Sequence, residues 1–163
     1  MTTHERPLRA WLGLAVFLAV AFAAGWVGSA VQGENVAARY LAFERPAWAP
    51  PQEAFGIVWP VLYLMIGVAA WQLWRRSPGV GAVATALSLW LGQLVLNAVW
   101  PGVFFGAEEF ALALAVIVVL DVLVGATVLV FARRDRVAAA LLVPYLLWLL
   151  YATALNAALL VLN

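Results

Sequence analysis

The apolar residues of this chain gather in five long stretches that contain almost no charge. We place these stretches at residues 10–31, 54–74, 80–104, 110–132 and 137–161, and Asp121 in the fourth is their only acid. A helix needs about 20 mostly apolar residues to cross a bilayer, and backbone groups in lipid must pair within the protein. The pattern therefore predicts an all-α membrane protein: a five-transmembrane-helix bundle that forms a single domain over residues 1–163.

The connections between these stretches are short, except for residues 32–53 between the first and the second. In this long loop Val36, Tyr40 and Phe43 share one helical face, which predicts a short amphipathic helix. Three prolines in residues 46–51 then favour an extended path into the second span. We expect this loop to form a semi-rigid cap over the bundle, and a surface loop without a role is the alternative.

Composition agrees with a membrane protein and excludes several classes of function. Hydrophobic residues make up 67% of the chain and charged residues 10%, whereas soluble domains carry about 25% charged residues. The net charge of +1 gives no basic field for nucleic acid. Because the chain has no cysteine and only one histidine, His4 in a polar N-terminal segment, we predict no metal site. No acid–base or nucleophile motif of a conventional enzyme is present.

Arginine placement predicts the orientation in the membrane. With five spans, one side of the membrane holds the N-terminus and the second and fourth loops. Seven arginines fall on that side: Arg6, Arg9, Arg75, Arg76, Arg133, Arg134 and Arg136. The other side holds only Arg39 and Arg45. The excess of positive charge on cytoplasmic loops therefore predicts a cytoplasmic N-terminus and an outer C-terminus, and we expect a bacterial inner-membrane protein.

Polar and aromatic residues recur on one helical face of three spans. They are Trp59 and Tyr63 on the second, Gln93, Asn97 and Trp100 on the third, and Tyr145, Trp148, Ala152 and Asn156 on the fifth. Amides within lipid spans point at protein or at a cavity. Two interpretations remain open at this stage. The residues form interhelical hydrogen bonds and aromatic packing, or they line an aromatic pocket with a few orienting amides.

Two further features of the spans suggest helix contacts or function. Asp121 is an acid inside a span, which fits either a structural hydrogen bond or a proton relay. On the third span the small residues Ala84, Ser88 and Gly92 recur every four positions, a spacing that permits close helix contact. This stripe predicts a homodimer seam, with packing inside one chain as the alternative.

Ordered motifs over residues 25–156 resemble the TspO/MBR family of tryptophan-rich sensory proteins and translocator proteins, once called peripheral benzodiazepine receptors. RPAWAPP at residues 45–51 is similar to the family's loop motif, and FGIVWPVLY at 55–63 to the start of its second helix. GQLVLNAVWPGVFFG at 92–106 is the most specific match, and VPYLLW at 143–148 with ATALN at 152–156 completes the set.

The resemblance implies a five-helix bundle, often dimeric, that binds porphyrins without a required cofactor. It implies a sensor, regulator or transporter of tetrapyrroles in contact with membrane lipids, and it extends to sterol-like or benzodiazepine-site ligands. The implied ligand-binding residues are Tyr40, Trp48, Pro51, Trp59, Tyr63, Asn97, Trp100, Phe104, Tyr145, Trp148 and Ala152. Two features depart from the family pattern. Glu53 stands where an aromatic is usual, and Ala157 follows Asn156 where the sterol motif of animal members has a tyrosine.

Three alternative functions remain open. Light-dependent degradation of protoporphyrin IX would use Trp59 and Trp148, which the resemblance matches to the family's photochemical tryptophans. A secondary transporter is the second alternative, although five spans do not divide into equal repeats. A purely structural membrane partner is the third, for which the stripe on the third span is the only sign in the sequence.

Overall fold

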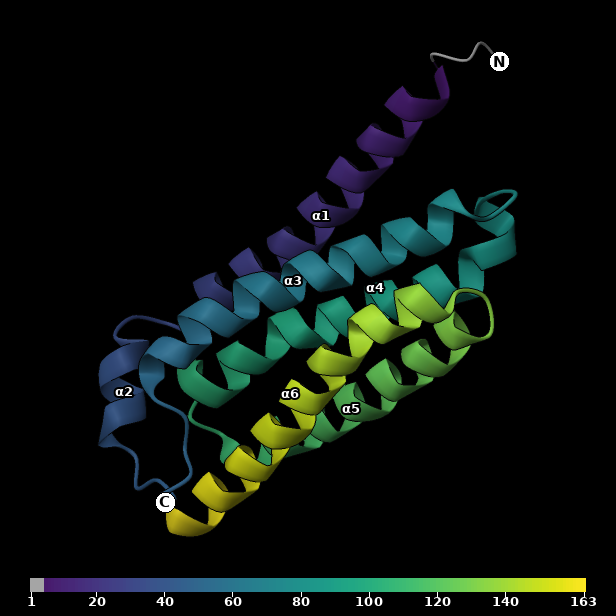
Figure 1. The fold of residues 1–163 in the computed structure, drawn as a ribbon. Coiled ribbons are helices and arrows are strands. Elements are labelled where there is room, and N and C mark those ends of the chain that lie inside the picture. Colours follow the sequence, from purple (N-terminus) through teal and green to yellow (C-terminus); the bar gives the residue numbers. More distant parts are fainter. Residues whose placement is uncertain (1–4) are drawn as a thin grey trace.

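The structure is a computed structural model that describes residues 5–163, with side chains from Arg9 onward. His4 and the side chain of Arg6 lie outside the described residues. The described helices run in the order α1 (Glu5–Val31), α2 (Val36–Ala42), α3 (Gln52–Arg75), η1 (Val80–Val83), α4 (Ala84–Pro101), η2 (Gly102–Gly106), α5 (Phe110–Ala132) and α6 (Arg136–Leu162). Figure 1 shows the five long helices side by side, with α2 against one end of the bundle.

The predicted all-α bundle with five membrane spans is confirmed. Among the described residues, five helical segments are long and apolar enough to cross a bilayer: Arg9–Val31, Gln52–Arg75, Val80–Gly106, Phe110–Ala132 and Arg136–Leu162. Their ends lie within two residues of the predicted ends, because charged residues or turns interrupt each apolar stretch at those places. The chain is therefore an integral membrane protein.

The five long helices form a closed ring in cross-section. Each one packs against two others, in the order α1, α3, α6, α5, α4 and back to α1. Their facing sides make up the main core, in which small residues such as Ala69 and Ala70 alternate with Ile66, Leu142 and other large ones. Small residues let two helices approach closely. Close approach matters in lipid, because helices there associate through van der Waals contact and not through the hydrophobic effect.

A local change of helix type ends the third span. Pro101 has no N–H to donate, and the following residues wind into a π-helix, η2, instead of continuing the α-helix. The backbone N–H of Ala107 donates to the carbonyl of Gly102 at 2.9 Å. Gly106 lets this turn lie against the end of α1, since a Cβ there would come within 3.0 Å of the Val31 carbonyl oxygen. The π-turn directs Phe104 and Phe105 inward, where both are buried.

Helix α2 and the proline-rich segment after it close one end of the ring, and we call residues 36–51 the cap. The predicted amphipathic helix is present, with Tyr40 buried and Val36 and Phe43 half-buried. The ring of Phe43 meets those of Phe110 at 5.1 Å and Phe104 at 6.4 Å between centroids. The cap therefore has its own small apolar core, separate from that of the ring.

Hydrogen bonds hold the cap against the bundle. The Arg39 guanidinium donates to the Phe105 carbonyl, and the Tyr151 hydroxyl donates to the Trp48 carbonyl at 2.8 Å. The Asn163 side chain pairs with both backbone groups of Glu44, at 3.0 Å and 3.1 Å. Partners from η2 and from the end of α6 thus fix the position of a segment that has little regular structure of its own.

Candidate ligand cavity

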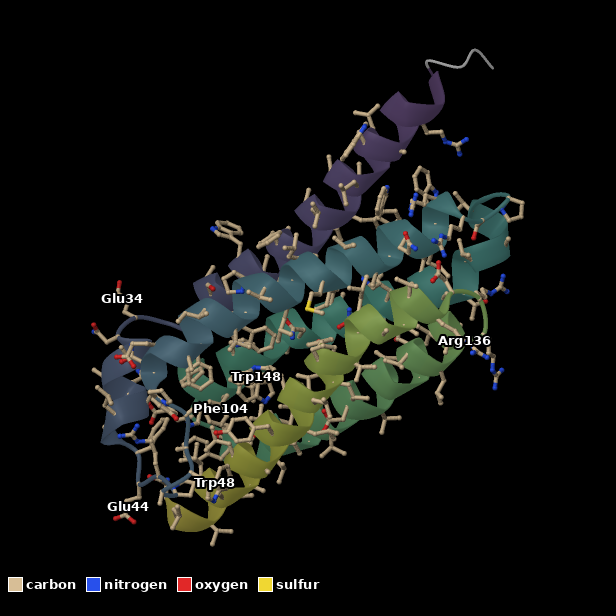
Figure 2. The ribbon with its side chains drawn as sticks, viewed as in Figure 1. Glu34, Glu44, Trp48, Phe104, Arg136 and Trp148 are labelled. Carbon is tan, nitrogen blue, oxygen red and sulfur yellow. The ribbon has the colours of Figure 1, made fainter. Side chains whose placement is uncertain are left out.

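A cavity of about 640 Å³ lies inside the ring, directly beneath the cap. Helices α1, α2, α3, α4 and α6 and the π-turn line it. Binding sites for small molecules are typically about 300–1,000 Å³ and mostly apolar with a few polar groups, and this cavity fits that description. Figure 2 shows Phe104 and Trp148 in the part of the bundle near the cap, with Arg136 at the opposite end.

The walls of the cavity are aromatic on several sides. Trp59 stacks on Tyr63 with their centroids 5.4 Å apart, and Trp100 stacks on Phe104 at 4.6 Å. Phe55 meets the edge of Trp148 at 5.9 Å. Gly25 on α1 makes room for this arrangement, since a Cβ there would come within 2.4 Å of the Tyr63 ring. The cavity is therefore suited to a flat, apolar molecule that stacks against aromatic faces.

A chain of buried hydrogen bonds leads away from the cavity through three helices. The Tyr63 hydroxyl donates to Oδ1 of Asn97 at 2.6 Å. Nδ2 of Asn97 donates to the Tyr145 hydroxyl at 3.1 Å, and that hydroxyl donates to Oε1 of Gln93 at 2.8 Å. Both alternatives raised by the sequence thus hold in part, because the amides join helices and Asn97 also lines the cavity.

Eight of the eleven predicted ligand-binding residues line the cavity: Tyr40, Trp59, Tyr63, Asn97, Trp100, Phe104, Trp148 and Ala152. The other three lie elsewhere. Tyr145 is fully buried behind Asn97, and Pro51 is exposed at the start of α3. Trp48 is 49% exposed on the outside of the cap, where its ring packs on Tyr151 at 5.8 Å.

Sequence reasoning missed the contribution of the first span. Phe22, Gly25, Trp26 and Ser29 of α1 line the cavity. No spacing in the sequence marks this face, because α1 is apolar on all sides. Glu53, which departs from the family pattern, lies exposed at the cavity rim as the only charged residue among the described lining residues.

Two polar atoms at the cavity have no hydrogen-bond partner in the described part of the chain. They are the indole nitrogen Nε1 of Trp148 and the amide oxygen Oδ1 of Asn156, and both are buried. The other amide atom of Asn156, Nδ2, donates to the Phe110 carbonyl at 3.0 Å. Buried polar atoms are seldom left unpaired in proteins, so these two are available for a ligand or for water.

The remaining residues singled out from the sequence lie outside the cavity. Oδ2 of Asp121 accepts from the Thr153 hydroxyl at 2.7 Å, which gives this acid an interhelical partner. On α4, Ala84 and Ser88 are exposed, while Gly92 is half-buried against Leu123 of α5. The described residues contain no group of three or more metal-ligating side chains.

Charged side chains at the two ends of the bundle contact buried or aromatic groups. At the end away from the cap, Arg76 forms an ion pair at 3.1 Å with the buried Asp135, whose other oxygen caps α6 through the N–H groups of Val137 and Ala138. Arg75 stacks over Trp71 at 4.5 Å. At the cap end, Arg45 lies over the ring of Tyr40. Burial raises the pKa of the Tyr40 phenol, so this group stays protonated and donates to the Pro50 carbonyl at 2.7 Å.

Comparison with known proteins shows which family and which relatives this sequence matches. A sequence model of the TspO/MBR family matches residues 15–162. The chain is 37% identical to the human translocator protein over 80% of this chain and 78% of that protein. It is 35% identical to the tryptophan-rich protein TspO of Chlorobaculum tepidum, over 93% of this chain and 96% of that one. It is also 35% identical to the tryptophan-rich sensory protein of Cereibacter sphaeroides, over 90% and 88%.

Proposed function

The chain belongs to the TspO/MBR family, and on that premise we propose that it binds porphyrin-type tetrapyrroles within the membrane as their sensor or carrier. The observation that carries this proposal is the aromatic cavity of about 640 Å³ beneath the cap. Its stacked pairs, Trp59 with Tyr63 and Trp100 with Phe104, offer flat apolar faces to a planar ring.

These contacts can supply the free energy that porphyrin binding requires. A micromolar dissociation constant corresponds to about −8 kcal/mol. Each aromatic pair contributes on the order of 1 kcal/mol beyond burial, and a ring that enters from water gains about 25 cal/mol per Å² of apolar surface that is removed from water. Several aromatic walls together can therefore hold a porphyrin after the entropic cost of binding has been met.

The test is a titration of the purified protein with protoporphyrin IX in the dark. Four of the nine tryptophans line the cavity (Trp26, Trp59, Trp100 and Trp148), so saturable quenching of tryptophan fluorescence is expected. The variant Trp59→Phe should bind more weakly, because it loses part of a stacking face. The matched control is Trp11→Phe, at a position 67% exposed on the outside of α1, and it should bind as the wild type does. Quenching that does not saturate would reject the proposal.

A second candidate function is light-dependent degradation of bound protoporphyrin IX. The observation in its favour is that Trp59 and Trp148 both line this one cavity, so a bound porphyrin would lie near two oxidisable indoles. Illumination of the complex should then bleach the porphyrin absorbance faster than illumination of free porphyrin. Bleaching that continues unchanged in the Trp59→Phe, Trp148→Phe double variant would remove these residues from the reaction.

We also propose that the protein self-associates through α4 and that its N-terminus is cytoplasmic. Ala84 and Ser88 present small exposed side chains on α4. Because the chain contains no cysteine, Ser88→Cys provides a single crosslinking site. Oxidation should yield a disulfide-linked dimer with this variant but not with Val122→Cys, at an exposed position on α5. The excess of arginines at the end away from the cap supports a cytoplasmic N-terminus. Cysteines introduced into the cap should then be labelled only from the outer side of the inner membrane.

A further inference from the structure

Asn156 lines the cavity, and one of its amide atoms has no hydrogen-bond partner in the described residues. Its side chain is fully buried, with an exposure of 0%. Nδ2 is engaged by the Phe110 carbonyl at 3.0 Å. Phe110 begins α5, the one long helix that contributes nothing to the described cavity wall. The N–H branch of the amide is thus directed toward α5, and Oδ1 on the other branch is a buried, unpaired acceptor in the cavity wall.

The orientation of this amide is fixed by its surroundings. Rotating the amide by half a turn would place Oδ1 against the Phe110 carbonyl, two acceptors facing each other without a proton. Asn156 therefore presents an acceptor, and only an acceptor, to the cavity. A buried acceptor without a donor is unfavourable, so a ligand that brings a donor to this place recovers a hydrogen bond.

Charge in the cavity restricts what that donor is. No basic side chain stands among the described residues that line the cavity, and the one acid, Glu53, is exposed at its rim. A carboxylate carried to the depth of Asn156 would have no cation to pair with, which is costly in an apolar site. An un-ionised carboxyl group has an O–H to donate and no charge to bury.

We infer that Asn156 is a specificity-determining residue, whose Oδ1 accepts a hydrogen bond from an uncharged donor on the ligand. For a porphyrin acid, that donor is a propionic acid side chain bound in its protonated form. This inference rests on the proposed function. It adds a chemical preference: the ligand enters with one uncharged donor group pointing at α6.

Trp148 supplies the complementary contact on the same helix. Its indole N–H is a buried donor without a partner in the described residues, and its ring lines the cavity. Trp148 and Asn156 are eight residues apart, which places their Cα atoms about 12 Å apart along α6. A ligand that satisfies both therefore carries an acceptor at one end and a donor at the other, and it lies lengthwise against α6.

The experiment compares two probes, protoporphyrin IX and its dimethyl ester, on the wild type and on Asn156→Leu. The two probes share the ring, but only the acid has a carboxyl O–H. Leucine has the same number of side-chain heavy atoms as asparagine and the same branch at Cγ, but it cannot accept a hydrogen bond. The expected result is that Asn156→Leu weakens the acid about tenfold, the effect of one buried hydrogen bond, and weakens the ester less than threefold. Since the two probes are compared on each variant, partial loss of folded protein affects both equally.

A pH series on the wild type provides the second readout. If the carboxyl binds un-ionised, the affinity for the acid should fall as the pH is raised from about 6 to 8, while the affinity for the ester stays constant. Equal losses of acid and ester in Asn156→Leu would overturn the inference, and so would an acid affinity that does not depend on pH. Failure of both probes to bind the wild type would instead overturn the proposed function.

Discussion

The buried hydrogen-bond chain behind the cavity makes a quantitative prediction for Tyr145→Phe. The substitution removes one hydroxyl group and keeps the ring, so packing is nearly unchanged. Two hydrogen bonds are lost: the one accepted from Asn97 at 3.1 Å and the one donated to Gln93 at 2.8 Å. Tyr145 has an exposure of 0%, so neither lipid nor bulk water replaces the hydroxyl.

The expected cost follows from what such bonds contribute in membranes. Interhelical hydrogen bonds in membrane proteins average about 0.6 kcal/mol and reach about 1.7 kcal/mol. Loss of two should lower the free energy of unfolding by about 1–3 kcal/mol. The assay is equilibrium unfolding in mixed micelles as the SDS fraction is raised, followed by far-ultraviolet circular dichroism.

The matched control is Tyr151→Phe, which removes a hydroxyl from the same helix. Its bond to the Trp48 carbonyl is exposed, so water can replace it, and we expect a change below about 0.5 kcal/mol. The double variant Tyr145→Phe, Gln93→Leu should lose less than the sum of the two single losses, because the residues share a bond. Equal free energies of unfolding for Tyr145→Phe and Tyr151→Phe would refute this account of the buried hydrogen bonds.

Three further predictions concern the cap, the first helix and the arginine-rich end. Asn163→Ala removes both bonds to Glu44 and should speed porphyrin dissociation several-fold in stopped-flow displacement, with equilibrium unfolding little changed. Gly25→Ala places a Cβ against the Tyr63 ring and should lower both porphyrin affinity and the melting temperature, at a cost of about 1–3 kcal/mol. A melting temperature equal to that of the wild type would show that the ring moves freely. Asp135→Ala removes the side chain that accepts hydrogen bonds at the N-terminus of α6 and pairs with Arg76. The variant should lower the free energy of unfolding in SDS by at least about 1 kcal/mol.

Most of the fold could be predicted from the sequence because the bilayer leaves few choices. Backbone groups in lipid must be paired, so an uncharged apolar stretch of sufficient length becomes a helix. The amides could also be placed, since the spacing of Gln93 and Asn97 fixes their shared face, and both are buried as that spacing requires. The hydrogen-bond partner of Asp121 could not be predicted from the sequence, because that partner, Thr153, lies on another helix.

The parts of the site that depend on contacts distant in sequence could not be predicted. Trp48 and Pro51 lie in the cap, whose path is set by bonds from Tyr151 of α6 and from Asn163, which follows α6. The first helix is apolar on all sides, so its sequence gives no sign of which face meets the cavity. Tyr145 precedes Trp148 by less than one turn, and that small difference in angle directs Tyr145 into the core and Trp148 to the cavity.

The central claim is that the cavity beneath the cap is where a porphyrin binds, and one matched pair of variants tests it most directly. Ala152 lines the cavity on α6, whereas Ala154, two residues later, is exposed on the same helix. The measurement is the dissociation constant of protoporphyrin IX in the dark for Ala152→Phe and for Ala154→Phe. We expect at least tenfold weaker binding for Ala152→Phe, because the new ring occupies the cavity, and an unchanged constant for Ala154→Phe. Wild-type affinity in both variants would contradict the claim and place the porphyrin elsewhere on the protein.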